Sequence, residues 1–196
     1  MAAICVFCAS STSLDQRRLD LAAETGRILA ERGHTLVSGG GCVGMMGAVT
    51  DGARSAGGHT LGIIPQYLVD LEVADLASGE LVVTDDMASR KIVMIDRSDA
   101  FITLPGGLGT LDELFEVWTL ATLDVHRKPI VLLDPDGFYD GLVGWLGGLT
   151  DQKFIRPAAM EMLLVARTVD EAVDIVEAAL ASPRSAPSGT ASPAEH

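Results

Sequence analysis

Basic residues, aromatic residues and long apolar runs are all scarce in this chain of 196 residues. Lysine and arginine number 14 against 27 aspartates and glutamates, which gives a formal net charge of −13. Nucleic acid is therefore not an expected partner, because binding a phosphate backbone requires clustered basic side chains. No apolar run approaches the roughly 20 residues of a membrane-spanning helix, so we expect no membrane partner. A small anionic ligand is still compatible with this charge, since local N–H groups act at short range.

Cysteine and histidine are also few. The three cysteines form an odd number, and the first residues lack the basic segment of a signal peptide, so we expect a reducing, cytoplasmic location. Cys5 and Cys8 have Cys-x-x-Cys spacing, which leaves a redox or metal role open beside ordinary buried thiols. Alternation along a strand would place the two on opposite faces, which favours buried thiols. The four histidines are isolated, with no pair at zinc-ligand spacing, and we expect no metal site.

Short apolar runs alternate with helical patterns along most of the chain. Strands are expected at residues 4–7, 34–37, 60–64, 81–84, 100–104, 130–133 and 163–165, and helices at residues 14–32, 43–56, 87–97, 110–123, 139–149 and 169–181. This alternation predicts an α/β fold with a mostly parallel sheet covered by helices on both faces.

The same patterns predict how the chain is organised. Residues 1–181 are expected to form one domain, within which residues 66–79 are irregular and acidic. The Ser-, Pro-, Ala- and Gly-rich residues 182–196 are expected to form a disordered tail. Trp118 and Trp145 lie in predicted helices, and we expect both in the core.

Two glycine-rich turns about sixty residues apart are the most specific features. Residues 38–47 read SGGGCVGMMG, and residues 105–113 read PGGLGTLDE. Each turn follows a predicted strand and opens a predicted helix, where free backbone N–H groups and the helix dipole bind anions. Because both turns fall at the carboxyl ends of parallel strands, we expect them to converge on one crevice that holds a phosphate-bearing ligand.

The first turn has a Gly-x-Gly-x-x-Gly pattern at Gly39, Gly41 and Gly44. A dinucleotide site of this kind needs an acidic residue at the end of the next strand, but that strand ends in Ile64 and Pro65. The pattern therefore argues against a conventional NAD site. It leaves open a phosphate-binding turn or a tight turn that only packs the helix.

The second turn places a carboxylate near its helix start. No lysine follows Gly109, so the turn is not a P-loop. Thr110 offers a hydroxyl beside its N–H, and Glu113 falls in the first helical turn, where the dipole favours its ionised form. Asp112 points in another direction, because adjacent helix positions do not face the same side. Glu113 either faces the ligand or only stabilises the helix end.

Polar residues follow two further strands. Arg90 and Lys91 form a cation pair after the fourth strand, where they contact a phosphate or carboxylate or form a solvated helix face. Ser10 and Ser11 follow the first strand, and their hydroxyls meet the ligand or cap the next helix. The sequence pattern does not separate these alternatives.

Together these segments resemble the LONELY GUY family, long labelled lysine decarboxylase-like, over residues 4–181. The matching pieces are CASS at residues 8–11, GGGCVGMMG at 39–47, MASRK at 87–91 and PGGLGTLDE at 105–113. The resemblance implies a Rossmann-like, doubly wound fold, a homodimer or larger assembly with the active site near the interface, and no metal or organic cofactor. It also implies hydrolysis of the N-glycosidic bond of a nucleoside 5′-monophosphate, cytokinin riboside monophosphate or AMP, to free base and ribose 5-phosphate.

The resemblance also assigns residues. It makes Arg90 and Glu113 the catalytic pair, and places phosphate or substrate contacts at Ser10, Gly41, Gly44, Met87, Lys91, Gly106, Gly107, Leu108, Gly109 and Thr110. Two departures from the family pattern, Ala9 and Ser89, bear on base or ribose contacts and remove no catalytic group.

The same residues leave two alternatives to hydrolysis to consider, a carrier role and a decarboxylase. A non-catalytic nucleotide-binding or carrier protein on the same fold is the alternative, and it would have little need of both Arg90 and Glu113. The old decarboxylase label would require pyridoxal phosphate on a lysine. The chain has only Lys91, Lys128 and Lys153, and nothing around them resembles such a site.

Overall fold

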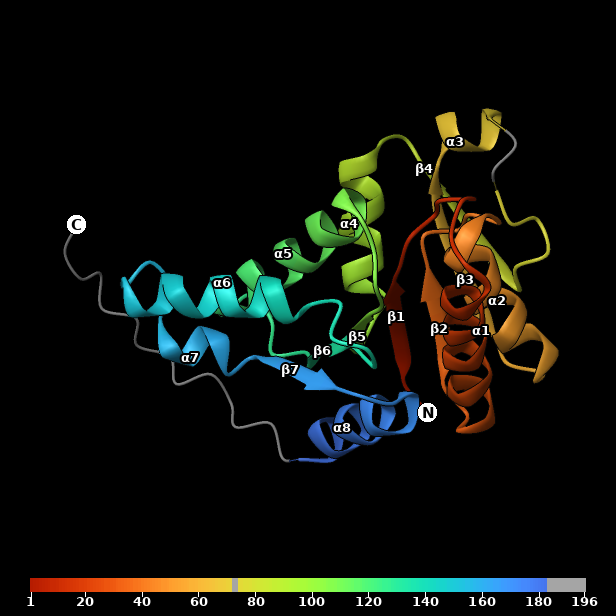
Figure 1. The fold of residues 1–196 in the computed structure, drawn as a ribbon. Coiled ribbons are helices and arrows are strands. Elements are labelled where there is room, and N and C mark those ends of the chain that lie inside the picture. Colours follow the sequence, from red (N-terminus) through yellow and green to blue (C-terminus); the bar gives the residue numbers. More distant parts are fainter. Residues whose placement is uncertain (72–73, 183–196) are drawn as a thin grey trace.

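A seven-stranded parallel sheet lies between two layers of helices in the computed structural model, which describes residues 1–71 and 74–182 (Figure 1). The strand order is β4-β3-β2-β1-β5-β6-β7, and every neighbouring pair is parallel. The strands are β1 (Ala3–Phe7), β2 (Thr35–Ser38), β3 (Thr60–Pro65), β4 (Glu80–Thr84), β5 (Ala100–Thr103), β6 (Ile130–Leu133) and β7 (Leu163–Ala166). The helices are α1 (Gln16–Glu31), α2 (Gly44–Ser55), α3 (Gln66–Asp70), α4 (Met87–Asp96), α5 (Leu108–Thr122), α6 (Asp140–Asp151), α7 (Pro157–Met160) and α8 (Val169–Ala181). The predicted doubly wound α/β fold is confirmed.

Each face of the sheet has its own hydrophobic core. Helices α1, α2 and α8 cover one face, and α4, α5 and α6 cover the other. Cys8 belongs to the first core and Cys5 to the second, and both thiols are buried. The prediction that strand alternation sends them to opposite faces is confirmed, because successive residues of a strand alternate between the faces.

The winding of the chain reverses beside β1. The chain builds β1 to β4 outward in one direction and then returns, so that β5 pairs with the opposite edge of β1. The loops that follow β1 and β5 therefore diverge to opposite faces and leave a crevice between them. Open α/β sheets bind ligands at this switch point.

Most predicted elements appear within a few residues of their expected limits, and α8 has the predicted bounds. Helix α5 begins at Leu108, two residues early, because Gly107 already takes the extended backbone of an N-cap. The segment 66–79, expected to be irregular, contains the short helix α3, and the four-residue α7 was not predicted. Of the predicted tail, only Ser182 lies within the described residues.

The two tryptophans have different environments. Trp118 is buried, and its Nε1–H donates to the Ala159 carbonyl at 2.8 Å, as a core position requires. Trp145 is 60% exposed, so its predicted core position was wrong. Helix α6 fully buries only Leu146 against the neighbouring elements, and the adjacent Trp145 consequently points away.

The helices differ in whether a side chain accepts hydrogen bonds from the backbone N–H groups of their first turn. Side chains of Asp15, Asp86 and Thr168 accept hydrogen bonds at the starts of α1, α4 and α8. The N-cap residues of α2 and α5, Val43 and Gly107, provide no side-chain hydrogen bond. These are the helices that follow the glycine turns, so their N-terminal N–H groups are left to other acceptors. Within the described part of the chain, no helix combines the length and apolar character needed to cross a bilayer.

Candidate active site

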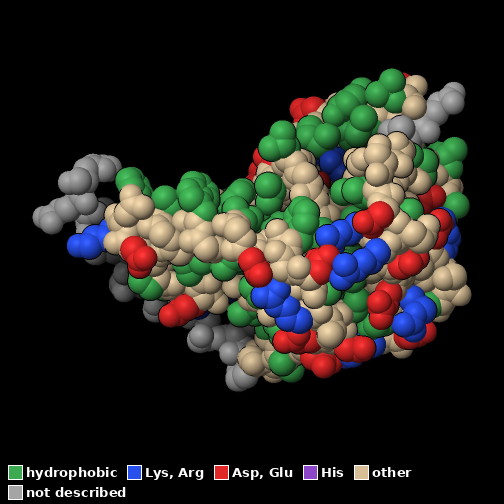
Figure 2. Space-filling model, viewed as in Figure 1, with side chains coloured by type: hydrophobic (Ala, Val, Ile, Leu, Met, Phe, Trp, Pro, Cys, Tyr) green, Lys and Arg blue, Asp and Glu red, His purple; other side chains and the backbone are tan. Residues whose placement is uncertain are grey.

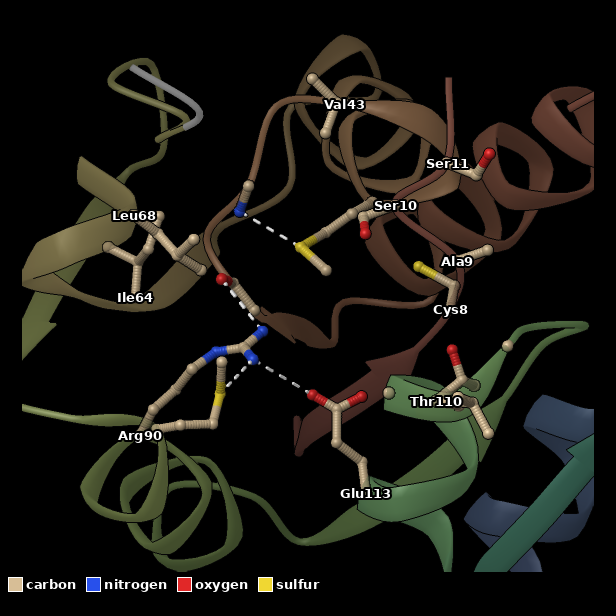
Figure 3. Close-up of a pocket in the computed structure, with 17 residues that line it drawn as sticks. Cys8, Ala9, Ser10, Ser11, Val43, Ile64, Leu68, Arg90, Thr110 and Glu113 are labelled. Atoms are coloured by element: carbon tan, nitrogen blue, oxygen red, sulfur yellow. Dashed lines mark hydrogen bonds and ion pairs between the residues drawn. The ribbon is translucent and has the colours of Figure 1, made fainter. Parts of the chain in front are cut away.

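A cavity of about 510 Å³ opens at the carboxyl ends of β1, β2, β3 and β5. Its volume lies in the range of roughly 300–1,000 Å³ that small-molecule sites occupy. It is lined by Cys8, Ala9, Ser10, Ser11, Gly39, Gly41, Val43, Met46, Ile64, Leu68, Met87, Arg90, Gly107, Leu108, Gly109, Thr110 and Glu113 (Figure 3). The expected convergence of the two glycine turns on one crevice is confirmed.

Most of the residues assigned from the sequence lie on this cavity, and three do not. Those that line it are Ser10, Gly41, Met87, Arg90, Gly107, Leu108, Gly109, Thr110 and Glu113. The structure places Gly44, Gly106 and Lys91 behind or beside it, and each has another structural partner.

The two glycines support the cavity wall from behind. Gly44 has a φ of +60°, and a Cβ there would lie 2.5 Å from the Ser11 carbonyl oxygen. Its lack of a side chain lets the loop after β1 pack against the first turn of α2, where the Met45 N–H donates to the Ala9 carbonyl at 2.9 Å. Gly106 packs against the Thr110 side chain. These contacts bring Ser10 and Thr110 to the cavity.

Lys91 lies between α4 and α5 instead of facing the cavity. Its Nζ is 3.0 Å from an oxygen of Asp112 and 3.0 Å from an oxygen of Glu116. Both acceptors belong to α5. Asp112 is therefore turned away from the cavity, and Glu113 alone of the two adjacent carboxylates lines it, as the helical geometry predicts.

Arg90 is buried and held by backbone carbonyls. Its Nε donates to the Ile63 carbonyl at 3.0 Å, and its Nη2 donates to the Gly39 carbonyl at 3.2 Å. Its Nη1 contacts the Met87 sulfur and lies 3.4 Å from Glu113 Oε1. A Cβ on Gly39 would lie 1.7 Å from Nη2, so this close approach requires glycine. Arg90 thus joins β3, the first glycine turn and α5.

Glu113 points toward Arg90 from α5 (Figure 3). It is 8% exposed, and burial raises the pKa of its carboxyl group to about 7, because the charged form loses hydration. Arg90 and Lys91 lower that pKa, while Asp112 and Glu116 raise it. The expectation that Glu113 falls in the first helical turn, where the dipole favours its ionised form, was wrong. Glu113 lies in the second turn of α5, where the dipole is weak and desolvation dominates.

The start of α5 forms the polar end of the cavity. The N–H groups in the first turn of a helix have no intrahelical acceptor, and here Gly107 supplies no capping side chain. A Cβ on Gly107 or Gly109 would meet open space, so these backbone atoms face the cavity. Leu108 is 89% exposed at the rim. The arrangement suits an anion that enters from the open side.

The opposite wall is apolar and was largely missed by sequence reasoning. Val43, Met46, Ile64 and Leu68 come from the first glycine turn, α2, β3 and α3. Val43 and Met46 fall inside the first glycine segment, residues 39–47, but all four side chains resemble ordinary core residues in the sequence. The position of Ile64 at the end of β3 was a further clue, because strand ends form the crevice.

Ser10 and Ser11 both line the cavity, and the helix after β1 has a different cap. Asp15 accepts from the Arg18 N–H at 3.0 Å. The Ser11 hydroxyl accepts from the Ser13 N–H at 3.3 Å. The capping alternative for the two serines is therefore wrong, and both remain candidate ligand contacts.

The donor set of the cavity does not fit pyridoxal phosphate. That cofactor is held through an imine to lysine, and Lys91, Lys128 and Lys153 all lie off the cavity. Lys91 pairs with α5 as described, and the Nζ of Lys128 donates to the Ile95 carbonyl at 2.6 Å. Among the described residues, no three His, Cys, Asp or Glu side chains are grouped to hold a metal ion.

The parallel sheet, the switch-point cavity and the uncapped helix start define a Rossmann-like protein whose cavity suits a small anionic ligand. Comparisons with known proteins narrow this class. A family model described as "Possible lysine decarboxylase" matches residues 46–176. A cytokinin riboside 5′-monophosphate phosphoribohydrolase of Mycobacterium tuberculosis is 54% identical over 170 residues, covering 87% of this chain and 90% of that protein. One from Arabidopsis thaliana is 42% identical over 174 residues, covering 89% of this chain and 81% of that protein. The chain therefore belongs to the LONELY GUY family.

The fold of this chain is also similar to that of a solved structure. The molybdenum cofactor binding protein of Rippkaea orientalis matches with a TM-score of 0.69 at 23% identity, covering 91% of this chain and 97% of that chain. At this identity the match establishes a shared fold and carries no information on the ligand.

Proposed function

We propose that the protein hydrolyses the N-glycosidic bond of a nucleoside 5′-monophosphate and releases the free base and ribose 5-phosphate. The observation that carries the proposal is one cavity onto which both the uncapped start of α5 and the buried carboxylate of Glu113 open. The names of the M. tuberculosis and A. thaliana relatives support the same reaction.

The phosphate is the first group to place. In this proposal it binds at the N–H groups of residues 107–110, with the Thr110 hydroxyl, Ser10 and Gly41 around it. The helix start provides a favourable field for a dianion in an otherwise acidic protein. Binding energy from this remote group aligns the sugar for reaction.

The ribose then lies against Glu113 and Arg90. As the bond from the ribose C1′ to the base nitrogen breaks, positive charge grows on the sugar ring. The ionised Glu113 carboxylate stabilises that charge, holds ribose hydroxyls or orients the attacking water. The water oxygen bonds to C1′, and its proton balances the electron pair that leaves with the base. Arg90, pinned by the Gly39 and Ile63 carbonyls, holds Glu113 in place.

The base fits the apolar wall formed by Val43, Met46, Ile64, Leu68 and Met87. This wall offers hydrophobic contact to adenine and to an N6-isoprenoid chain alike. Turnover measured side by side on AMP and isopentenyl-AMP identifies the preferred substrate.

The central test is adenine release from AMP, followed by chromatography. We expect Glu113→Ala to lower kcat by at least ~100-fold, because a preorganised group that stabilises transition-state charge contributes several kcal/mol. Glu161→Ala, an exposed carboxylate away from the cavity, is the matched control and should retain activity. A folded Glu113→Ala protein with normal turnover would overturn the mechanism.

The same assay addresses the carrier alternative. A nucleotide carrier would bind AMP, detected by calorimetry, and leave it intact over prolonged incubation. If the wild-type protein releases adenine catalytically, a purely binding role is excluded. Binding without release in the wild type would remove the hydrolase proposal.

We further propose a homodimer with the cavity near its interface, in the cytoplasm. The exposed apolar side chains of Trp145 and Phe154 support an interface on the α5–α6 side. The three free cysteines support a reducing compartment.

A further inference from the structure

The strongest feature outside the cavity is the ionic cluster that joins α4 to α5. The Lys91 Nζ lies 3.0 Å from Asp112 Oδ2 and 3.0 Å from Glu116 Oε2. The lysine side chain is only 17% exposed, against 60% for Asp112 and 33% for Glu116. The ammonium group is therefore the shielded centre of the cluster, with the exposed Asp112 on its solvent side and the buried Oε2 of Glu116 beside it.

The cluster lies directly beside the catalytic pair in sequence and in space. Lys91 follows Arg90 on α4, and Asp112 precedes Glu113 on α5. Arg90 and Glu113 belong to different helices and are 3.4 Å apart, so their separation depends on how α4 is set against α5. Both helices also pack on the same core, through Met94 and Leu114.

We propose that Lys91 is a positioning residue for the hydrolysis, which fixes α5 against α4 so that Glu113 meets Arg90 at the cavity and which sets the charge around Glu113. This inference rests on the proposed function. It replaces the expected contact of Lys91 with substrate, because its ammonium is already held by two carboxylates away from the cavity.

The residue types suit this role. Asp112 and Glu116 are four residues apart, so they lie on one face of α5, where two like charges repel each other. A lysine between them relieves that repulsion and has three N–H donors to share between two acceptors. Glu113 lies on the neighbouring face and makes no contact with the ammonium group, so Lys91 acts on it through position and field.

The field at Glu113 comes from three elements. Arg90 and Lys91 on α4 lower the pKa of its carboxyl group, whereas Asp112 and Glu116 on α5 raise it. The third element is β1 with the residue that follows it, where the carboxylate contributes to raising the pKa of the buried thiols of Cys5 and Cys8. Removing Lys91 therefore takes away a favourable cation and leaves two unfavourable anions. Removing the charge of Glu116 takes away one of these anions and leaves the cation, so the pKa of Glu113 should fall.

Two variants with opposite expected effects test the inference. Lys91→Met keeps much of the side-chain volume and removes the charge, and Glu116→Gln keeps the shape and removes an anion. The acidic limb of the pH profile for adenine release should move to higher pH in Lys91→Met and to lower pH in Glu116→Gln. We also expect kcat on AMP to fall by about 10-fold or more in Lys91→Met with KM changed less than about 3-fold, because catalytic geometry is lost while phosphate contacts remain.

Carbon-13 NMR of the Glu113 carboxyl, assigned with Glu113→Gln, measures the same titration without turnover. If the wild type releases no adenine, the proposed function fails, yet this titration still tests Lys91. Arg97→Met is the matched control, since Arg97 is a cation at the far end of α4 in an exposed pair with Glu80. It should leave both titration and kcat unchanged. If Lys91→Met does not fold, Asp112→Asn is measured in its place, because Asp112 is more exposed than Lys91. The titration of Glu113 should then shift to lower pH, because an anion beside it has been removed.

Unchanged titration and kcat in Lys91→Met would overturn the inference. Shifts of Lys91→Met and Glu116→Gln in the same direction would also overturn it, because a general loss of stability moves both variants alike.

Discussion

Glu113 shows how a single residue departs from its local sequence context. Its position near a helix start favours an ionised carboxylate, but the core packs around it and burial raises its pKa to about 7. Proximity to Arg90 opposes this shift without cancelling it. The residue consequently titrates near neutral pH, where small changes in its surroundings change its charge.

The raised pKa of Glu113 links function to stability. Between pH 4.5 and 7 the folded protein holds a proton that the unfolded chain has released, so the contribution of this group to stability is full below pH 4.5 and is lost as pH rises through 7. The difference is on the order of 3 kcal/mol. Glu113→Gln removes this dependence, so its free energy of unfolding relative to wild type should rise by about that amount between pH 4.5 and 8. Urea denaturation across this range measures the difference, and a pH-independent difference would show that Glu113 does not titrate there.

Activity should show the corresponding dependence at the same residue. The proposed reaction uses the ionised carboxylate, so adenine release by the wild type should fall as pH drops through about 7. A rate that stays constant from pH 8 to 5 would mean that the protonation state of Glu113 is irrelevant to turnover.

At the scale of elements, the segment 66–79 is attached to the first glycine turn by Asp75. Its N–H donates to the Gly40 carbonyl at 2.8 Å, and Ala74 forms a bridge to Gly41. The buried Asp75 carboxylate accepts from Arg54 Nη1 at 3.0 and 3.1 Å, and from Ala77 N–H and the Ser78 hydroxyl. Arg54 belongs to α2, which the glycine turn opens, and it also pairs with Asp51. Asp75 and Ala74 thus link this segment by hydrogen bonds both to the first glycine turn and to α2.

Breaking this attachment should loosen one wall of the cavity. Asp75→Ala removes the acceptor and leaves Arg54 and two local donors without it, at a cost of about 2 kcal/mol of stability. Because α3 carries Leu68 on the cavity wall, KM for isopentenyl-AMP should rise several-fold while kcat changes less. Chymotrypsin, which cleaves after residues such as Tyr67 and Leu71, should cut the variant faster than wild type. Equal cleavage rates and equal KM values would show that Asp75 does not hold the segment.

At the scale of the whole molecule, apolar side chains gather along one edge. Figure 2 shows hydrophobic side chains along the upper edge, above α6 and at α3. A groove of about 430 Å³ on the α5–α6 side is lined by Phe115, Trp118, Thr119, Thr122, Trp145, Leu146, Leu149, Phe154, Ile155, Arg156 and Ala159. Trp145 and Phe154 are 60% and 77% exposed there. Exposed apolar patches of this kind mark interaction surfaces.

The proposed homodimer predicts a specific effect at this edge. Trp145→Glu places a charge in the groove, so light scattering should report single chains of 20.5 kDa where the wild type forms dimers. If the cavity lies near the interface, adenine release should fall with dissociation. Val125→Glu, an exposed apolar residue away from the groove, is the control and should remain dimeric. A wild type that is monomeric at micromolar concentration would contradict the proposal.

The sequence alone determined the alternation of strands and helices, because apolar periodicity and glycine breaks are local properties of the chain. It also determined that both glycine turns lie at one edge, since parallel strands all point their carboxyl ends the same way. Tertiary structure decided what periodicity does not contain. Tertiary packing buried Glu113, turned Lys91 from the cavity toward α5, left Trp145 exposed and brought Leu68 to the cavity wall. These outcomes depend on contacts between residues distant in sequence, and a side chain's neighbours in the fold set its burial and its charge.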